Sequence, residues 1–158
     1  PSQRPGLAEQ DWEAWSAIEA LHANGNVRAV GVSNFDYMQL ELLLSRADVK
    51  PQFVQNRCFA VRGWDLQVRQ VCQEHGITYQ GFSLLTANQE IWHSRRVAEI
   101  GNVHNLSAAQ VIFCLAMDLG ILPLTGTSDA SHMAGDLACE PGVLTSAEVR
   151  ELAPSVVE

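Results

Sequence analysis

The chain has 158 residues, of which 47% are hydrophobic and 18% charged, and 10 Lys and Arg against 18 Asp and Glu give it a net charge of −8. This composition is typical of a folded globular domain and excludes a disordered chain. The acidic balance argues against nucleic-acid binding, and no apolar run reaches the ~20 residues that a membrane span requires.

Helices and strands are predicted to alternate along the first half of the chain. A helix is expected from Asp11, because apolar residues recur at helical spacing up to Asn24-Gly25, where glycine can adopt the left-handed conformation. Asp36 and Asp65 are suited to begin two further helices. Short apolar runs predict strands over residues 27–32, 53–58 and 77–82.

The second half begins with a longer connection, because an extra segment over residues 86–105 follows the third strand. Ser107 and Thr145 each precede a Gln or Glu by three positions, a pattern that predicts the capped start of a helix. Between these two helices we expect a strand over residues 121–124 and a further helix from Asp129.

The order of the elements predicts the fold class. The first three strands start 26 and 24 residues apart, the period of one βα unit, and such alternation is typical of a parallel sheet covered by helices. The glycine-rich sequences of dinucleotide-binding and P-loop folds are absent. A (β/α)8 TIM barrel needs about 250 residues. The four strands therefore predict an α/β half-barrel, a single domain over residues 1–158.

In the order of the strands, the chain contains the short motifs Gly31-Val-Ser-Asn-Phe35, Lys50-Pro51 with Gln55, Gly81-Phe-Ser-Leu-Leu85 and Ile121-Leu-Pro123. Together they resemble the aldo-keto reductase superfamily. Gly31-Val-Ser-Asn-Phe35 is similar to the fifth barrel strand of that family, and Lys50-Pro51 with Gln55 is similar to the sixth. Gly81-Phe-Ser-Leu-Leu85 and Ile121-Leu-Pro123 resemble the seventh and eighth strands. The resemblance implies the C-terminal half of an oxidoreductase that moves hydride between a nicotinamide cofactor and a carbonyl or alcohol.

The resemblance also implies where the cofactor, NADP or NAD, would bind. Ser33, Asn34 and Gln55 would bind the nicotinamide carboxamide, which needs both donors and acceptors. The alternative is that Ser33 and Asn34 only cap the next helix. Phe82 would stack on the nicotinamide ring, unless it is an ordinary core residue. The remaining implied contacts, to the phosphates and the adenosine, are Ser83, Leu84, Leu85, Thr125, Gly126, Thr127, His132 and Asp136.

Two of these positions put a preference for NADPH in doubt. Family members that use NADPH hold its 2′-phosphate with a lysine and an arginine, whereas this chain has Leu124 and, near the arginine position, His132. A neutral imidazole does not replace a guanidinium. Asp129 and Asp136 add negative charge to the same region.

No catalytic residue is expected in this chain. The tyrosine, lysine, aspartate and histidine that the family uses come from barrel strands two to four, and the resemblance begins just after strand four. The chain is therefore expected to be the cofactor-binding half of a carbonyl reductase and inactive alone. The alternative is a non-catalytic half-barrel that serves as a scaffold or interaction module.

Half of a closed barrel leaves two open strand edges and an uncovered concave face, which we expect to carry Val30, Val32 and Tyr79. These features predict a homodimer or a complex with the missing N-terminal half-barrel. The completed barrel would take a small carbonyl compound as substrate, and neither nucleic acid nor a membrane is an expected partner.

The cysteines and histidines predict no metal site. The four cysteines form no C-x-x-C pair, so we expect them to be reduced, buried residues of a cytoplasmic protein. The five histidines are scattered along the chain, without the spacing of a metal site. The first ten residues contain no apolar segment, so no secretory signal is expected.

Overall fold

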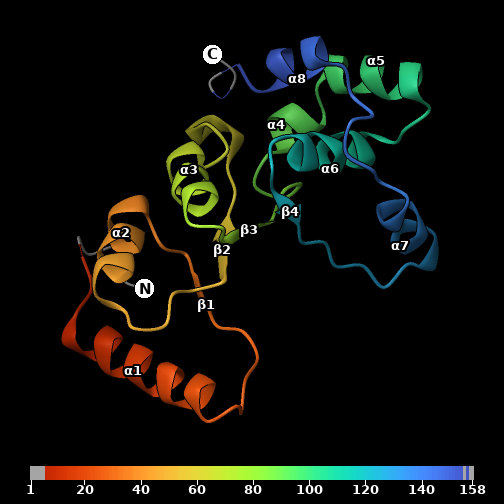
Figure 1. The fold of residues 1–158 in the computed structure, drawn as a ribbon. Coiled ribbons are helices and arrows are strands. Elements are labelled where there is room, and N and C mark those ends of the chain that lie inside the picture. The colour runs from red at the N-terminus through yellow and green to blue at the C-terminus, as the bar shows by residue number, and fades with distance from the viewer. Residues whose placement is uncertain (1–5, 155, 157–158) are drawn as a thin grey trace. The chain divides into compact units, whose positions relative to one another are not determined.

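The computed structural model describes residues 6–154 and 156 (Figure 1). In chain order its elements are α1 (Glu9–Ala23), β1 (Gly31–Ser33), α2 (Tyr37–Arg46), β2 (Phe53–Arg57), the 3₁₀ turn η1 (Ala60–Arg62), α3 (Leu66–Glu74), β3 (Thr78–Phe82), α4 (Gln89–Trp92), α5 (Arg95–His104), α6 (Ala108–Asp118), β4 (Leu122–Pro123), α7 (Ala130–Leu137) and α8 (Ser146–Leu152). The chain divides into two compact units. The first unit is Pro1–Asn56 with Gln67–Tyr79, and the second is Arg57–Leu66 with Gln80–Glu158.

The four strands are parallel and follow the order β1-β2-β3-β4, which confirms the predicted α/β class. In the first unit, residues 31–33 of β1 pair with residues 53–55 of β2. In the second unit, residues 80–81 of β3 pair with residues 122–123 of β4. Within each pair the carboxyl ends lie at the same edge, where ligands bind in α/β folds.

All four strands are shorter than predicted, β2 and β3 by one residue each and β1 and β4 by more. The strand expected over residues 27–32 begins only at Gly31, because the N–H of Val30 donates to the side chain of Gln52 at 2.7 Å instead of to a neighbouring strand. The strand expected over residues 121–124 is reduced to Leu122–Pro123. The N–H of Ile121 donates to Ala116 in the last turn of α6, and Pro123 has no N–H.

Side-chain caps set several helix starts. Asp36, Ser107 and Thr145 each accept a hydrogen bond from the backbone N–H three residues later, and the starts predicted there are confirmed. The start predicted at Asp11 is wrong, because α1 begins two residues earlier. The Asp11 carboxylate lies inside the first turn and accepts from the N–H of Ala8 at 2.8 Å.

The core of the first unit is built from α1, α2 and the segment before β1. Its buried members are Trp15, Val30, Leu43 and Ala47, with Val32 packed against them. Val30 is 6% exposed and Tyr79 is 3% exposed. The prediction that these two side chains lie on an uncovered concave face is therefore wrong, because the chain buries both by itself.

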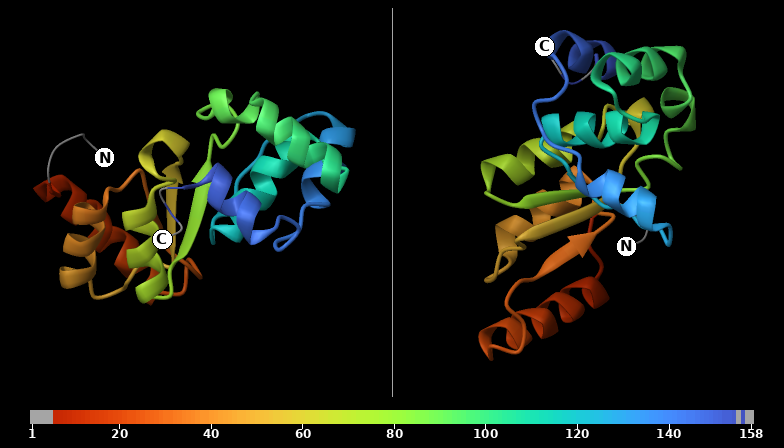
Figure 2. Two further views of the ribbon diagram at one scale, coloured as in Figure 1. Left: turned by 90° about the horizontal axis from the view of Figure 1, so that it is seen from above. Right: turned by 90° about the vertical axis from the view of Figure 1, so that its right-hand side faces the viewer.

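The second unit is organised around α6. Residues 111–116 of this helix are all buried, and it contacts α4, α5, α7, α8 and β4 (Figures 1 and 2). A helix that is apolar on every side belongs in a protein core. Among the described residues no single helix is long and apolar enough to cross a membrane, and α5 with α6 meets that criterion only as a pair bent by 87°.

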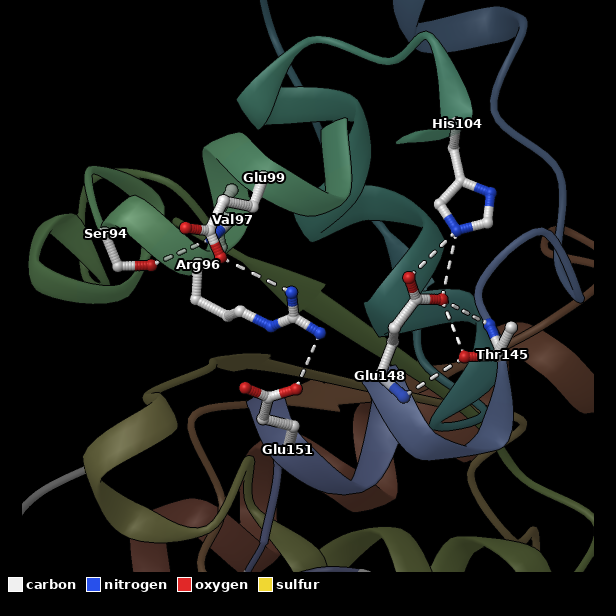
Figure 3. Close-up of polar contacts among 8 residues, drawn as sticks. All are labelled: Ser94, Arg96, Val97, Glu99, His104, Thr145, Glu148 and Glu151. Atoms are coloured by element: carbon white, nitrogen blue, oxygen red, sulfur yellow. Dashed lines mark hydrogen bonds and ion pairs between the residues drawn. The ribbon is translucent and has the colours of Figure 1, made fainter. Parts of the chain in front are cut away.

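Ion pairs join α5 to α8 at the surface of the second unit (Figure 3). Nε2 of His104 lies 3.0 Å from Oε2 of Glu148, and a guanidinium nitrogen of Arg96 lies 2.8 Å from a carboxylate oxygen of Glu151. Glu148 also accepts hydrogen bonds from the N–H and the hydroxyl of Thr145. Burial would raise the pKa of Glu148, but the hydrogen bonds from Thr145 and His104 outweigh burial and hold this pKa below its usual range.

The lowered pKa of Glu148 makes the docking of α8 sensitive to acid. A carboxylate whose pKa is lower in the folded state adds stability above its unfolded value, 4.5, and this contribution is lost as the pH falls through the folded value. We expect wild type to be more stable than Glu148→Gln at pH 6, and the difference to shrink steadily below pH ~4.5. Urea unfolding of both proteins across this pH range measures the difference in their free energy of unfolding. A difference that does not depend on pH would contradict the lowered pKa of Glu148.

Candidate functional site

The residues implied to bind the nicotinamide lie together at the carboxyl ends of β1 and β2. Ser33 is paired with Gln55 across the two strands, and the N–H of Asn34 donates to the carbonyl oxygen of Gln55 at 3.0 Å. The side-chain amide of Asn34 donates to Oγ of Ser33 at 3.2 Å, and both residues are exposed. The next helix is capped by Asp36, so the alternative that Ser33 and Asn34 serve as its cap is wrong.

The loop that carries Asn34 is held by a buried side chain that the sequence analysis missed. Asn56, 6% exposed, accepts from the N–H of Phe35 at 3.1 Å and donates to the carbonyl oxygen of the same residue at 2.7 Å. Asn34 itself has a left-handed backbone with φ of 56°. The two hydrogen bonds fix the chain directly after this conformation, so the polar groups of Ser33 and Asn34 are preorganised.

The segment implied to follow the nicotinamide and the pyrophosphate lies at the carboxyl end of β3 in the second unit. Phe82 is half-buried, and its carbonyl oxygen accepts from the N–H of Cys58 at 3.1 Å. Ser83 has a left-handed backbone with φ of 58°. Leu84 is 1% exposed, so its side chain is part of the core. Only the backbone of Leu84 is therefore left to contact a ligand, while Leu85 is half-buried beside it.

A second asparagine that the sequence analysis missed links the loops after β2 and β3. The side-chain oxygen of Asn88 accepts from the N–H of Ala60 at 2.6 Å. Its side-chain nitrogen donates to the carbonyl oxygens of Cys58 at 2.9 Å and Leu84 at 2.8 Å. With 5% of its surface exposed, Asn88 is buried and all its polar groups are satisfied. Asn88 thus acts as a positioning residue for both loops.

Four of the residues implied to bind the far end of the cofactor line a cavity of about 400 Å³. Thr125, Gly126, Thr127 and Asp136 all belong to its wall, which is completed by the mainly apolar side chains of Phe113, Met117, Leu122, Pro123, Met133, Leu137 and Cys139. The hydroxyl of Thr125 donates to the carboxylate of Asp136 at 2.7 Å. An apolar wall with few polar groups suits an aromatic ring with a hydroxylated attachment, such as adenosine.

The N-terminus of α7 is already occupied by a carboxylate of the chain itself. Oδ1 of Asp129 accepts from the backbone N–H groups of Ser131 and His132 at 2.8 and 3.1 Å. The Ser131 hydroxyl and these two N–H groups hold the pKa of Asp129 below its usual range. His132 is exposed and is not part of the cavity wall. The helix end that would attract a phosphate therefore carries a negative charge instead.

The cysteines are free thiols, and three of the four are buried as predicted: Cys58, Cys72 and Cys114. The exception, Cys139, is half-buried and lines the cavity. Burial, followed by the proximity of Cys114, raises the pKa of the Cys139 thiol to about 12. Since only a thiolate is a strong nucleophile, Cys139 contributes an apolar surface to the cavity and no reactive group at neutral pH.

The polar groups present can be compared with the parts of the implied cofactor. Ser33, Asn34 and Gln55 offer the donors and acceptors that a carboxamide needs. At the cavity, Asp136 is part of the wall, and no lysine or arginine belongs to the wall among the described residues. The residues therefore fit a carboxamide at the strand ends, and the cavity wall supplies no cation for a phosphate.

Known proteins match this chain over nearly its whole length. The model of the Aldo/keto reductase family matches residues 4–155. The chain is 34% identical over 112 residues to glyoxal reductase of Bacillus subtilis, covering 71% of this chain and 40% of that protein. It is 29% identical over 137 residues to the NADPH-dependent alpha-keto amide reductase of Saccharomyces cerevisiae, covering 77% of this chain and 42% of that protein.

Solved structures show the same fold. The crystal structure of MGS-M4, an aldo-keto reductase from a deep-sea metagenome library, superposes with a TM-score of 0.84 at 17% identity, over 94% of this chain and 56% of that one. The chain thus spans about half the length of that structure and about two fifths of the two curated relatives. Because the family model covers residues 4–155, the chain belongs to the aldo/keto reductase family.

Proposed function

We propose that this chain is the cofactor-binding half of an aldo-keto reductase that uses a nicotinamide dinucleotide to interconvert a carbonyl and an alcohol. The arrangement of Ser33, Asn34 and Gln55 at adjacent strand ends supports this most directly. The bound nicotinamide would supply the hydride. The chain's own residues would bind and orient the dinucleotide, while a proton donor for the carbonyl would come from the other half of the barrel.

The proposed cofactor is NADH in preference to NADPH. The yeast relative is named for its use of NADPH, but the region that the resemblance implies for a 2′-phosphate has Asp129 and Asp136 instead of a lysine and an arginine. Like charges a few ångströms apart repel by about 1 kcal/mol or more, depending on their exposure to water. The negative 2′-phosphate would therefore add no favourable binding free energy at this site.

Titration of the chain with NADH and NADPH, followed by calorimetry, tests the function and the preference together. We expect NADPH to bind no more tightly than NADH. Replacement of Asp136 by Asn removes one charge and should improve NADPH binding several-fold relative to NADH. The matched control is Glu140→Gln, because Glu140 is an exposed acid close in sequence that does not line the cavity. A sub-micromolar NADPH affinity of wild type would overturn the preference, and no binding of either dinucleotide would overturn the function.

The second candidate function is a non-catalytic scaffold, in which the half-barrel binds another chain. Among the described residues β1 and β4 have one partner strand each, so each leaves one edge without a neighbouring strand, and Leu122 on β4 is 46% exposed. We propose that these edges pair with a second copy or with an N-terminal half-barrel. Light scattering distinguishes this from a 17.3 kDa monomer. Carbonyl reduction that appears only after an N-terminal half-barrel is added would favour the enzyme over the scaffold.

A further inference from the structure

Sulfur-containing side chains gather at the cavity of about 400 Å³ in the second unit. Two of the three methionines of the chain, Met117 and Met133, belong to its wall together with Cys139. Met117 lies in α6 and Met133 in α7, two helices that contact each other, and Cys139 lies two residues after the end of α7. We call Met117, Met133 and Cys139 the sulfur cluster.

A fourth sulfur-containing residue fixes the place of Cys139 against α6. The side chains of Cys139 and Cys114 form a hydrogen bond with each other. Cys114 is buried and lies three positions before Met117, and residues at this spacing are neighbours on one face of a helix. Cys139 is therefore held beside the turn of α6 that carries Met117. The side chain of Met133 is unbranched and 49% exposed, so it is free to turn toward the other sulfur atoms.

The wall of the cavity suits a soft cation. Asp136 is its only charged residue within the part of the chain that the structure describes, and the rest of the wall is mainly apolar. An ion bound there needs a ligand of opposite charge, and one thiolate neutralises a monovalent cation. Among the described residues no three His, Cys, Asp or Glu side chains are placed to hold a metal, so the ligand set of a zinc site is missing. Thiolates and thioethers are the ligands that select Cu(I).

We propose that the sulfur cluster binds one Cu(I) ion, through the thiolate of Cys139 and the thioethers of Met117 and Met133. The S–H bond of Cys139 is replaced by a sulfur–copper bond, the proton goes to water, and the copper stays monovalent, so no oxidant or reductant takes part. The pKa of this thiol is raised to about 12, so each bound ion must displace one full proton at neutral pH. The inference does not rest on the proposed function, because the ion needs no dinucleotide.

Anaerobic titration of the reduced chain with Cu(I), in competition with the chromophoric chelator bicinchoninate, tests the inference. We expect one tightly bound equivalent, and an X-ray absorption spectrum in which sulfur atoms alone surround the copper. Cys139→Ser should bind Cu(I) at least a hundredfold more weakly. Met133→Leu changes an exposed side chain, so it should fold as wild type does and bind at least tenfold more weakly. The matched control is Met38→Leu, at an exposed methionine of α2 in the first unit, which should change the affinity less than twofold.

Proton release distinguishes the sulfur cluster from a site made of two cysteines. Calorimetry of Cu(I) binding in buffers with different ionisation enthalpies should give one proton released per ion at pH 7. Two protons would place the copper between Cys114 and Cys139 and would overturn the role of the methionines. Wild-type affinity in Met133→Leu or Cys139→Ser, or a wild type that leaves all Cu(I) with the chelator, would also overturn the inference. Zn²⁺ that binds as tightly as Cu(I) would contradict a site built from soft ligands.

Discussion

Replacement of Asn88 by Ala is expected to lower the free energy of unfolding of the second unit by about 3 kcal/mol, because a buried group left without its hydrogen bond costs ~1–3 kcal/mol. The substitution removes three hydrogen bonds at once, to Ala60, Cys58 and Leu84. It leaves one N–H and two carbonyl groups of the loops without this partner, in a place where Asn88 itself is only 5% exposed. Urea unfolding gives the energy, and hydrogen exchange of the Ala60 amide shows whether the loop has opened.

The controls for Asn88→Ala distinguish the loss of the hydrogen bonds between the two loops from a general effect of shortening an amide side chain. Gln89→Ala removes an exposed amide one position later, at the start of α4, and should change stability by about 0.5 kcal/mol or less. Asn88→Asp keeps an acceptor for the N–H of Ala60 but turns a carboxylate oxygen toward two carbonyl oxygens, so it should destabilise as Asn88→Ala does. Wild-type stability with a protected Ala60 amide in Asn88→Ala would contradict the assigned role.

Replacement of Gly31 by Ala is expected to destabilise the first unit by about 2–3 kcal/mol, since overpacking typically costs 1–3 kcal/mol. A Cβ at this position would lie 2.5 Å from the carbonyl oxygen of Phe53 and 2.9 Å from its Cβ. The obstacle is the backbone of the neighbouring strand, so rotation of a side chain does not relieve it. The pairing of β1 with β2 would be distorted, and with it the register of Ser33 and Gln55.

Gly126→Ala is the matched control for Gly31→Ala. A Cβ at Gly126 would meet no atom within 4 Å, and we expect a change of about 0.5 kcal/mol or less. Thermal unfolding of the two variants and wild type, followed by circular dichroism, gives the comparison. Equal melting temperatures for Gly31→Ala and Gly126→Ala would show that the strands tolerate the added methyl group.

Most of the helices could be predicted because their signals lie within four residues. At Ser107 and Thr145, for example, the cap and the residue that completes the box are three positions apart, and the structure forms both as expected. The positions of Ser33, Asn34 and Gln55 at strand ends were likewise foreseeable, since a strand's carboxyl end follows from the direction of the chain. Binding by these residues stays a prediction.

The links that hold the site were hidden from the sequence because they join residues far apart. Asn56 contacts Phe35, 21 positions away, and Asn88 contacts Cys58, 30 positions away. No sequence pattern predicts the partner of an asparagine within a strand or a loop. Its hydrogen bonds depend on which backbone groups the fold brings close to its side chain. The N-terminus of α7 is different, because Asp129 accepts a hydrogen bond from the N–H of Ser131, only two positions away. The sequence could therefore have predicted that Asp129 competes with a phosphate for this helix end.

The sequence by itself determined the order of the four strands, the parallel sheet and the membership of the family, because these depend on local caps, apolar periodicity and motif order. The helices α4 and α5, within the extra segment, were not predicted. Only the tertiary structure decided the true start of β1, where the side chain of Gln52 takes the N–H of Val30, and the burial of Val30 and Tyr79. It alone brought Met117, Met133 and Cys139 to one cavity. Side-chain pairing across the fold is fixed by packing in three dimensions, which no local pattern records.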